Sequence, residues 1–164
     1  MKKSIILFCV TVLLACNARR PAIKTGFEGK PLPAFDLLLN DSTTVMNTGS
    51  IPAGKPIVLI YFSPRCPFCR AQMDGIVKDI AELKDIRFYI FTTWPFREMK
   101  DFYKHYRLDK YPNISVGVDY NNFFSDRFKI TGVPYMAIYR KDKKLNEAFM
   151  GNINSQQIKE VAEN

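Results

Sequence analysis

The stretch YFSPRCPFCRAQM, residues 61–73, joins two segments with different hydrophobic patterns. Before Ser63, the run PIVLIYF at residues 56–62 is almost wholly β-branched or aromatic, which is typical of a strand buried on both faces of a sheet. After Cys66, residues 67–83 have apolar side chains at helical spacing, so we expect an amphipathic helix with one face on that sheet. Cys66 and Cys69 therefore lie where a central strand passes into a helix.

The remaining segments alternate in the same way. We expect strands at residues 34–39, 43–47, 86–93, 114–119, 135–141 and 144–151, and helices at residues 97–108, 122–130 and 154–164. Strands that alternate with helices and end in a hairpin and a helix predict an α/β fold, with a central mixed β-sheet flanked by helices and an N-terminal strand extension. In such sheets functional groups gather beyond the carboxyl ends of the parallel strands, where the two cysteines are expected.

The first sixteen residues, MKKSIILFCVTVLLAC, have the pattern of a targeting segment. Two lysines precede an apolar stretch of 11 residues, 5–15, which is shorter than the roughly 20 residues that cross a membrane as a helix. LLAC at its end resembles a bacterial lipobox, which implies cleavage after residue 15 and a lipid on Cys16; an ordinary secretory signal is the alternative. We expect residues 1–15 to be a lipoprotein signal peptide, residues 16–29 a tether, and residues 30–164 the folded domain.

Removal of the leader changes both the cysteine count and the charge. Of the four cysteines, Cys9 leaves with the signal peptide and Cys16 carries the lipid, so Cys66 and Cys69 remain as thiols in a compartment where disulfides persist. The formal charge of +8 loses the two lysines of the leader and becomes +6. Positive and negative side chains alternate, as in RKDKK, which favours a mixed, solvated surface; we expect no nucleic-acid partner.

The position of the two cysteines predicts that they are chemically unequal. Cys66 lies at the expected helix start, where unpaired N–H groups and the helix dipole favour a thiolate. Cys69 lies one turn further in and suits the role of a resolving thiol. Pro67 fits the first helical turn, where its missing N–H costs little. Arg65 adds a cation that would further favour the Cys66 thiolate, although an exposed charge is screened.

Three other interpretations of the cysteine pair are open at this stage. A structural disulfide between Cys66 and Cys69 would close a very short loop and stabilise little. A structural zinc site needs four ligands, and the remaining histidine, His105, falls in a separate predicted helix, where a surface position is its ordinary role. Two-coordinate copper binding by the two cysteines stays possible, but we expect no metal site.

Pro134, which directly precedes a predicted strand, is a candidate to lie beside the two cysteines. In KITGVPYMAIY, residues 129–139, the Val133–Pro134 bond precedes the strand that begins at Tyr135. A cis proline beside a dithiol would hold an open backbone edge toward an incoming peptide, and a plain strand-start proline is the alternative. Phe68, Trp94 and Tyr135 are candidates for an apolar rim of this groove, with a core position equally open for Trp94.

SPRCPFC after a buried strand, together with GVPY before a hairpin, resembles the thioredoxin fold. With its lipobox leader, the chain is similar to the extracytoplasmic TlpA/ResA-like, redoxin-type thiol–disulfide oxidoreductases over residues 30–164. The resemblance implies that Cys66 is the attacking thiol, Cys69 the resolving thiol and Pro134 a cis proline, with Val133 lining the substrate groove. It implies no cofactor beyond the redox-active disulfide Cys66–Cys69.

The chain departs from that family pattern at the acid that moves a proton to or from the second cysteine. Cytoplasmic thioredoxins have a buried aspartate where this chain has Ile60, and ResA-type proteins have a glutamate where this chain has Gln72. The order CPFC, with proline first, is that of glutaredoxin- and DsbA-like sites, but Phe68 supplies neither charge nor a hydrogen-bond donor.

The resemblance implies a lipid-anchored thiol–disulfide oxidoreductase in a bacterial cell envelope, facing the periplasm. Its partners would be protein thiol or disulfide clients, an electron-transfer partner, and the membrane through the lipid on Cys16. The family favours a reductant, for example in cytochrome c maturation. Two alternatives are a peroxiredoxin-like peroxidase, although its usual threonine is Ser63 here, and a non-enzymatic copper- or client-binding module of the same fold.

Overall fold

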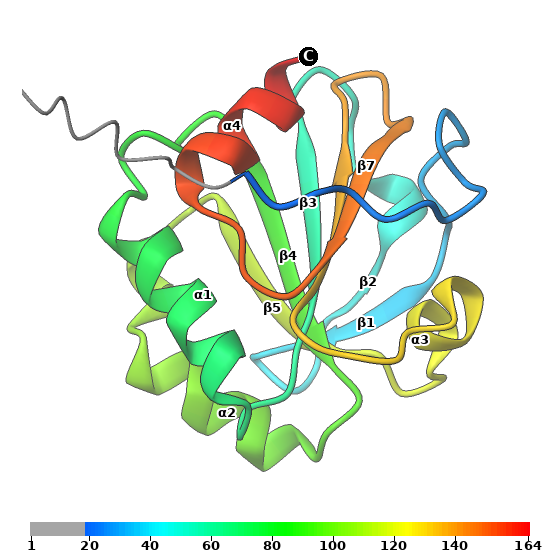
Figure 1. The fold of residues 1–164 in the computed structure, drawn as a ribbon. Helices are drawn as coiled ribbons and strands as arrows, with labels where there is room; N and C mark the ends of the chain where they lie inside the picture. Colours follow the sequence, from blue (N-terminus) through cyan, green and yellow to red (C-terminus); the bar gives the residue numbers. More distant parts are fainter. Residues whose placement is uncertain (1–18) are drawn as a thin grey trace, which may run out of the picture.

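The computed structural model describes residues 19–164, which form a seven-stranded mixed sheet in the order β2-β1-β5-β4-β3-β6-β7 (Figure 1). The predicted signal peptide and Cys16 lie outside the described residues. Strands β3 (Ile57–Tyr61), β4 (Arg87–Thr92) and β5 (Ile114–Val118) are parallel, and β6 (Tyr135–Tyr139) and β7 (Leu145–Met150) continue the sheet as antiparallel strands. The predicted N-terminal extension consists of β1 (Asp36–Leu39) and β2 (Val45–Asn47), added beside β5.

Helices cover both faces of the sheet, and β3 lies between them. Helices α1 (Pro67–Lys78), α2 (Phe96–His105) and α4 (Ser155–Glu163) pack on one face, while α3 (Phe123–Phe128) and the N-terminal segment pack on the other (Figure 1). Alternate residues of β3 enter the two cores: Val58 and Ile60 face α1 and α2, and Ile57 and Leu59 face α3. The continuous apolar run therefore is a strand buried on both faces, as the sequence predicts.

Two predicted helices are shorter than their apolar patterns. Helix α1 ends at Lys78, and the following residues continue as turns that still bury Leu83. Helix α2 ends at His105, because Arg107 adopts a left-handed conformation with φ of 51°, and Leu108 then begins a short 3₁₀ helix (Leu108–Lys110). In both cases buried apolar side chains continue the helical pattern into turns, so periodicity overestimates the length of the helix.

Residues 20–29 are packed on the domain, so the expected tether is wrong for this part of the chain. The N–H of Ile23 donates to the carbonyl of Ala148 at 2.8 Å, and the N–H of Gly29 donates to that of Leu145 at 2.8 Å. Phe27 meets Phe128 edge-on, with ring centroids 5.2 Å apart. Strand β7 is the edge of the sheet and would otherwise leave these carbonyls without a strand partner, which is why an irregular segment is held there.

Within residues 19–164, the structure contains no helix that is long and apolar enough to span a membrane.

Candidate active site

Helix α1 begins at the cysteine motif, at the carboxyl end of β3. Cys66 is the N-cap residue, with φ of −75° and ψ of 122°, and Pro67 occupies the first helical turn as predicted. The carbonyl of Cys66 accepts from the N–H of Arg70 at 3.1 Å, and the N–H of Cys66 donates to Ser63 at 3.1 Å. The Cys66 side chain therefore stands at the mouth of α1, where the helix dipole favours negative charge.

The two cysteines are free thiols in different surroundings. Cys66 is half-buried, whereas Cys69 is buried in the core beneath α1. Burial raises the pKa of the Cys69 thiol to about 12, against a backbone hydrogen bond with Ser63 that lowers it; the neighbouring Cys66 raises it further. Cys69 is thus held protonated in ordinary conditions, whereas Cys66 is the more accessible of the two thiols and lies at the helix mouth.

The Val133–Pro134 peptide bond is cis and lies beside Cys66. The Cys66 thiol donates to the carbonyl oxygen of Val133 across 3.7 Å. Pro134 is buried, and its carbonyl accepts from the N–H of Gly151 at 2.7 Å, which ties the loop before β6 to the loop after β7. The structure therefore brings the predicted proline and dithiol together at one place.

Of the three aromatic residues predicted to form a rim, two lie near the site and one does not. Phe68 is 65% exposed at the first turn of α1, and the half-buried Trp94 packs against the guanidinium of Arg65, 4.9 Å from its ring centroid. Tyr135 is only 2% exposed and packs against Phe124 and Phe128 on the opposite face of the sheet. The prediction for Tyr135 is wrong, because alternation along β6 directs its side chain into the second core.

The end of β7 and the loop after it add two residues to the site that could not be recognised from the sequence. Met150 is 39% exposed, and its sulfur lies 3.6 Å from the hydroxyl oxygen of Thr131, close to the cis-proline loop. Asn152 donates from Nδ2 to the carbonyl of Phe68 at 2.9 Å, which holds the first turn of α1. Neither residue belongs to a motif, so only the sheet order, which places β7 beside β6, could have indicated them.

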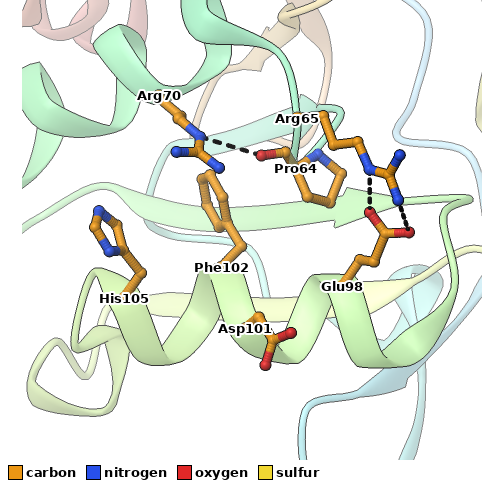
Figure 2. Close-up of a pocket in the computed structure, with 7 residues that line it drawn as sticks. All are labelled: Pro64, Arg65, Arg70, Glu98, Asp101, Phe102 and His105. Carbon is orange, nitrogen blue, oxygen red and sulfur yellow. Dashed lines mark hydrogen bonds and ion pairs between the residues drawn. The ribbon is translucent and has the colours of Figure 1, made fainter.

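Glu98, in the first turn of α2, is the third residue that was missed. It accepts from Nε and Nη2 of Arg65 at 2.8 and 2.9 Å, as Figure 2 shows. The hydrogen bonds and the charge of Glu98 raise the pKa of Arg65. The cation predicted to favour the Cys66 thiolate is therefore paired with a carboxylate.

The Arg65–Glu98 pair forms one end of a groove of about 370 Å³ between the start of α1 and helix α2. Its lining residues are Pro64, Arg65, Arg70, Glu98, Asp101, Phe102 and His105 (Figure 2). His105 is exposed on α2, with its ring against that of Tyr106, and does not join the cysteines. Within residues 19–164, no group of three or more His, Cys, Asp or Glu side chains could hold a metal ion.

Gln72 holds α1 to the loop before α4 and is buried. Its Nε2 donates to the carbonyl of Ile153 at 3.0 Å, and its Oε1 accepts from the N–H of the same residue at 2.9 Å. The amide is therefore matched to one backbone unit through both of its polar atoms. Ile60, the other position where the family has an acid, is an apolar core residue.

Tyr106 lies near Cys69, and the carboxylate of Asp74 lies near Tyr106. Burial, followed by the charge and hydrogen bond of Asp74, raises the pKa of Tyr106 to about 12, and Cys69 also contributes. The Tyr106 hydroxyl donates to the carbonyl of Arg70 at 3.1 Å. Tyr106 thus stays protonated at neutral pH and cannot take up the proton of Cys69.

The sheet order, the two thiols at the mouth of α1 and the cis proline beside them are those of a thioredoxin-like fold. The chain belongs to the thioredoxin-like domain family, whose model matches residues 50–164. It is 27% identical over 133 residues to an uncharacterized protein of Haemophilus influenzae, a match that covers 78% of this chain and 85% of that protein.

Solved structures with the same fold include two named disulfide proteins. A secreted disulfide oxidoreductase of Mycobacterium tuberculosis, homologous to Escherichia coli DsbE, has 22% identity and a TM-score of 0.62, with 77% of this chain and 91% of that chain covered. A DsbE-type thiol:disulfide interchange protein of Chlorobium tepidum has 17% identity and a TM-score of 0.65, with 82% and 96% covered. At these identities the likeness shows the fold.

The two hydrogen bonds between the Gln72 side chain and the backbone of Ile153, called here the Gln72 clamp, predict that the stability of Gln72→Glu depends on pH. The new carboxyl can donate to the carbonyl of Ile153 only when protonated, so burial and this acceptor should raise its pKa in the folded protein. Stability is then nearly unchanged near pH 4, below the usual pKa of a glutamate, and is lost as the pH rises through the folded pKa. We expect the free energy of unfolding to fall by about 2 kcal/mol at pH 8, measured by urea unfolding at both pH values.

Gln156→Glu is the matched control, because Gln156 is exposed on α4 and undergoes the same change of charge. Gln156→Glu should lower the free energy of unfolding by less than about 0.5 kcal/mol at either pH. A Gln72→Glu protein as stable as wild type at pH 8 would contradict the clamp.

Proposed function

We propose that this protein exchanges disulfides with protein clients through Cys66 and Cys69. The observation that carries the proposal is the contrast between the two thiols, with Cys66 at the helix mouth facing the carbonyl of Val133 and Cys69 buried with its pKa raised to about 12. An accessible nucleophile and a protected second thiol one turn away are what a two-step exchange requires.

In the reductive direction, the Cys66 thiolate attacks one sulfur of a client disulfide. The client S–S bond breaks, the departing sulfur takes up a proton, and a mixed disulfide joins Cys66 to the client. Cys69 then gives up its proton, attacks the sulfur of Cys66 and releases the second client thiol. Two electrons pass from the dithiol to the client, and the protein is left with a Cys66–Cys69 disulfide.

The client would lie as an extended segment against the cis-proline loop. The carbonyl of Val133 faces the attacking sulfur, so a client backbone placed there brings its own cysteine over Cys66. Phe68 and Met150 flank this place with exposed apolar surface, and Trp94 lies beyond Arg65. These contacts would be selective for apolar side chains near the client cysteine.

The exchange reaction can be tested with two cysteine variants. Reduction of insulin or of a glutathione mixed disulfide should be lost in Cys66→Ser, because the attacking sulfur is absent. Cys69→Ser should stop at a mixed disulfide that is visible by non-reducing electrophoresis or mass spectrometry, because the resolving thiol is absent.

Exchange at the wild-type rate in Cys66→Ser would contradict the proposal. Peroxide consumption through a sulfenic acid on Cys66, without exchange, would support the peroxidase instead. Stoichiometric Cu(I) binding without exchange would support a metal-binding module.

We further propose that the protein acts as a reductant and is recharged by an electron-transfer partner. A strong oxidant needs a strongly stabilised thiolate in its reduced form. Here the one cation next to Cys66 in the chain is paired with Glu98, and burial disfavours a thiolate at Cys69. The role in cytochrome c maturation that the family suggests would use this direction.

The reduction potential of the Cys66–Cys69 couple tests this direction. Equilibration with glutathione redox buffers should give a value nearer the roughly −270 mV of thioredoxin than the roughly −120 mV of the oxidant DsbA. A value near the second figure would mean that the protein oxidises its clients.

We propose that a lipid on Cys16 anchors the protein in a bacterial cell envelope, with the domain facing the periplasm. The leader and its LLAC ending support this, and one structural neighbour is a secreted protein. Because the packed segment begins at Arg20, only a few residues would separate the lipid from the domain, and the domain would lie close to the bilayer surface.

The anchor is tested by Cys16→Ser in cells that process lipoproteins. The variant should move from the membrane fraction to the soluble fraction of the envelope, because no acyl chain can be added at serine. Mass spectrometry of the wild-type N-terminus should show the acylated cysteine. Wild-type protein found without lipid in the soluble fraction would contradict the proposal.

A further inference from the structure

We propose that Glu98 is a positioning residue that controls the stability of the Cys66 thiolate by neutralising Arg65. The inference rests on the proposed function only in taking Cys66 as the attacking thiol. In this arrangement the Arg65–Glu98 pair carries no net charge, so Arg65 adds little to the thiolate stabilisation that the mouth of α1 supplies.

The contacts of the Arg65 guanidinium fix it in place from two sides. Two nearly equal hydrogen bonds, 2.8 and 2.9 Å long, join it to both oxygens of Glu98 in the fork-to-fork geometry of a strong ion pair (Figure 2). Its central carbon lies 4.9 Å from the centre of the Trp94 ring. The Arg65 side chain is 70% exposed and that of Glu98 is 25% exposed, so the carboxylate is the better shielded partner.

Several other charged groups lie on the same side of the site as Arg65. Arg70 of α1 donates to the carbonyl of Pro64 at 3.3 Å, and Asp101 and His105 of α2 line the groove with it. On the opposite side, residues 130–134 before β6 and residues 150–154 at and after the end of β7 contain no charged side chain of their own, but the guanidinium of Arg20 donates to the carbonyls of Met150 and Asn152 at 3.0 and 2.8 Å. Arg65 is therefore the cation that directly precedes Cys66 in the chain, and Glu98 is the carboxylate that neutralises it.

Single substitutions of Arg65 and of Glu98 should change the stability of the Cys66 thiolate in opposite directions. Glu98→Gln leaves an uncompensated cation, so the thiolate becomes easier to form, the reduced dithiol is stabilised and the disulfide becomes a stronger oxidant. Arg65→Gln leaves an uncompensated carboxylate and does the reverse. In the double variant Arg65→Gln/Glu98→Gln both charges are absent, and the thiolate should return to near its wild-type stability.

The pattern of signs separates this role from a structural one. If the ion pair served only to hold the loop before α1 against α2, either single substitution would break the same contact. Both substitutions would then change the stability of the Cys66 thiolate in the same direction, and the double variant would not restore the wild-type stability. Cancellation of the two shifts is therefore the signature of a charge effect.

The experiment measures the reactivity of Cys66 and the redox equilibrium of the Cys66–Cys69 couple in the purified protein. The rate of iodoacetamide modification of Cys66 at about pH 6 should rise about two- to fivefold in Glu98→Gln and fall about two- to fivefold in Arg65→Gln, since exposed charges are screened. The equilibrium with glutathione should change with it; a threefold change corresponds to about 14 mV. Added salt should shrink both shifts.

Lys55 and Asp85 provide the matched control. They form an exposed ion pair at 3.3 Å near the amino ends of β3 and β4, at the other end of the sheet from Cys66. Lys55→Gln and Asp85→Asn make the same changes in net charge and should leave the rate of Cys66 modification indistinguishable from that of wild type.

Shifts of the same sign in both single variants, or no shift in either, would overturn the proposal. Neither measurement requires a client, because both follow the Cys66 and Cys69 sulfurs themselves. A protein that fails to exchange disulfides with clients but shows the opposite, cancelling shifts would refute the proposed function and leave the role of Glu98 standing.

Discussion

The antiparallel pairing of β3 with β6 is the constraint on which the site depends. Tyr61 pairs with Tyr135 at the carboxyl end of β3, so the loop that leaves β3 and the loop that enters β6 lie at the same end of the sheet. This register brings the Cys66 sulfur to 3.7 Å from the carbonyl oxygen of Val133. Because β3 is buried on both faces, a shift of one residue would exchange its two core surfaces, and packing far from the cysteines thereby fixes their geometry.

The elements that carry the chemistry could be predicted because each has a strong local cause. The run at residues 56–62 leaves no polar face, which requires a central strand. Pro67 fits only the start of a helix, which places Cys66 at its mouth. The apolar spacing of residues 73–83 identifies the face on the sheet, even though the helix itself ends at Lys78. Local patterns of this kind do not depend on knowing the strand order.

What could not be predicted depends on contacts between distant parts of the chain. Glu98 is one of several charged residues in an amphipathic helix, and its pairing with Arg65 follows from the packing of α2 beside the start of α1. Tyr135 looks like a rim residue beside Pro134 until the alternation of β6 is known. Gln72 occupies a helix position that the sequence alone would leave exposed, and only the loop at Ile153 buries it.

The same long-range contacts explain why the CPFC motif does not by itself determine the direction of electron flow. The motif supplies a helix mouth for Cys66, which favours a thiolate in any protein of this fold. Burial of Cys69, which raises its pKa, and the pairing of Arg65 with Glu98 both come from the rest of the domain, and in our proposal they limit how far the reduced form is stabilised. In the proposed reductant, a buried thiol and a carboxylate on a neighbouring helix would therefore decide which partner receives the electrons.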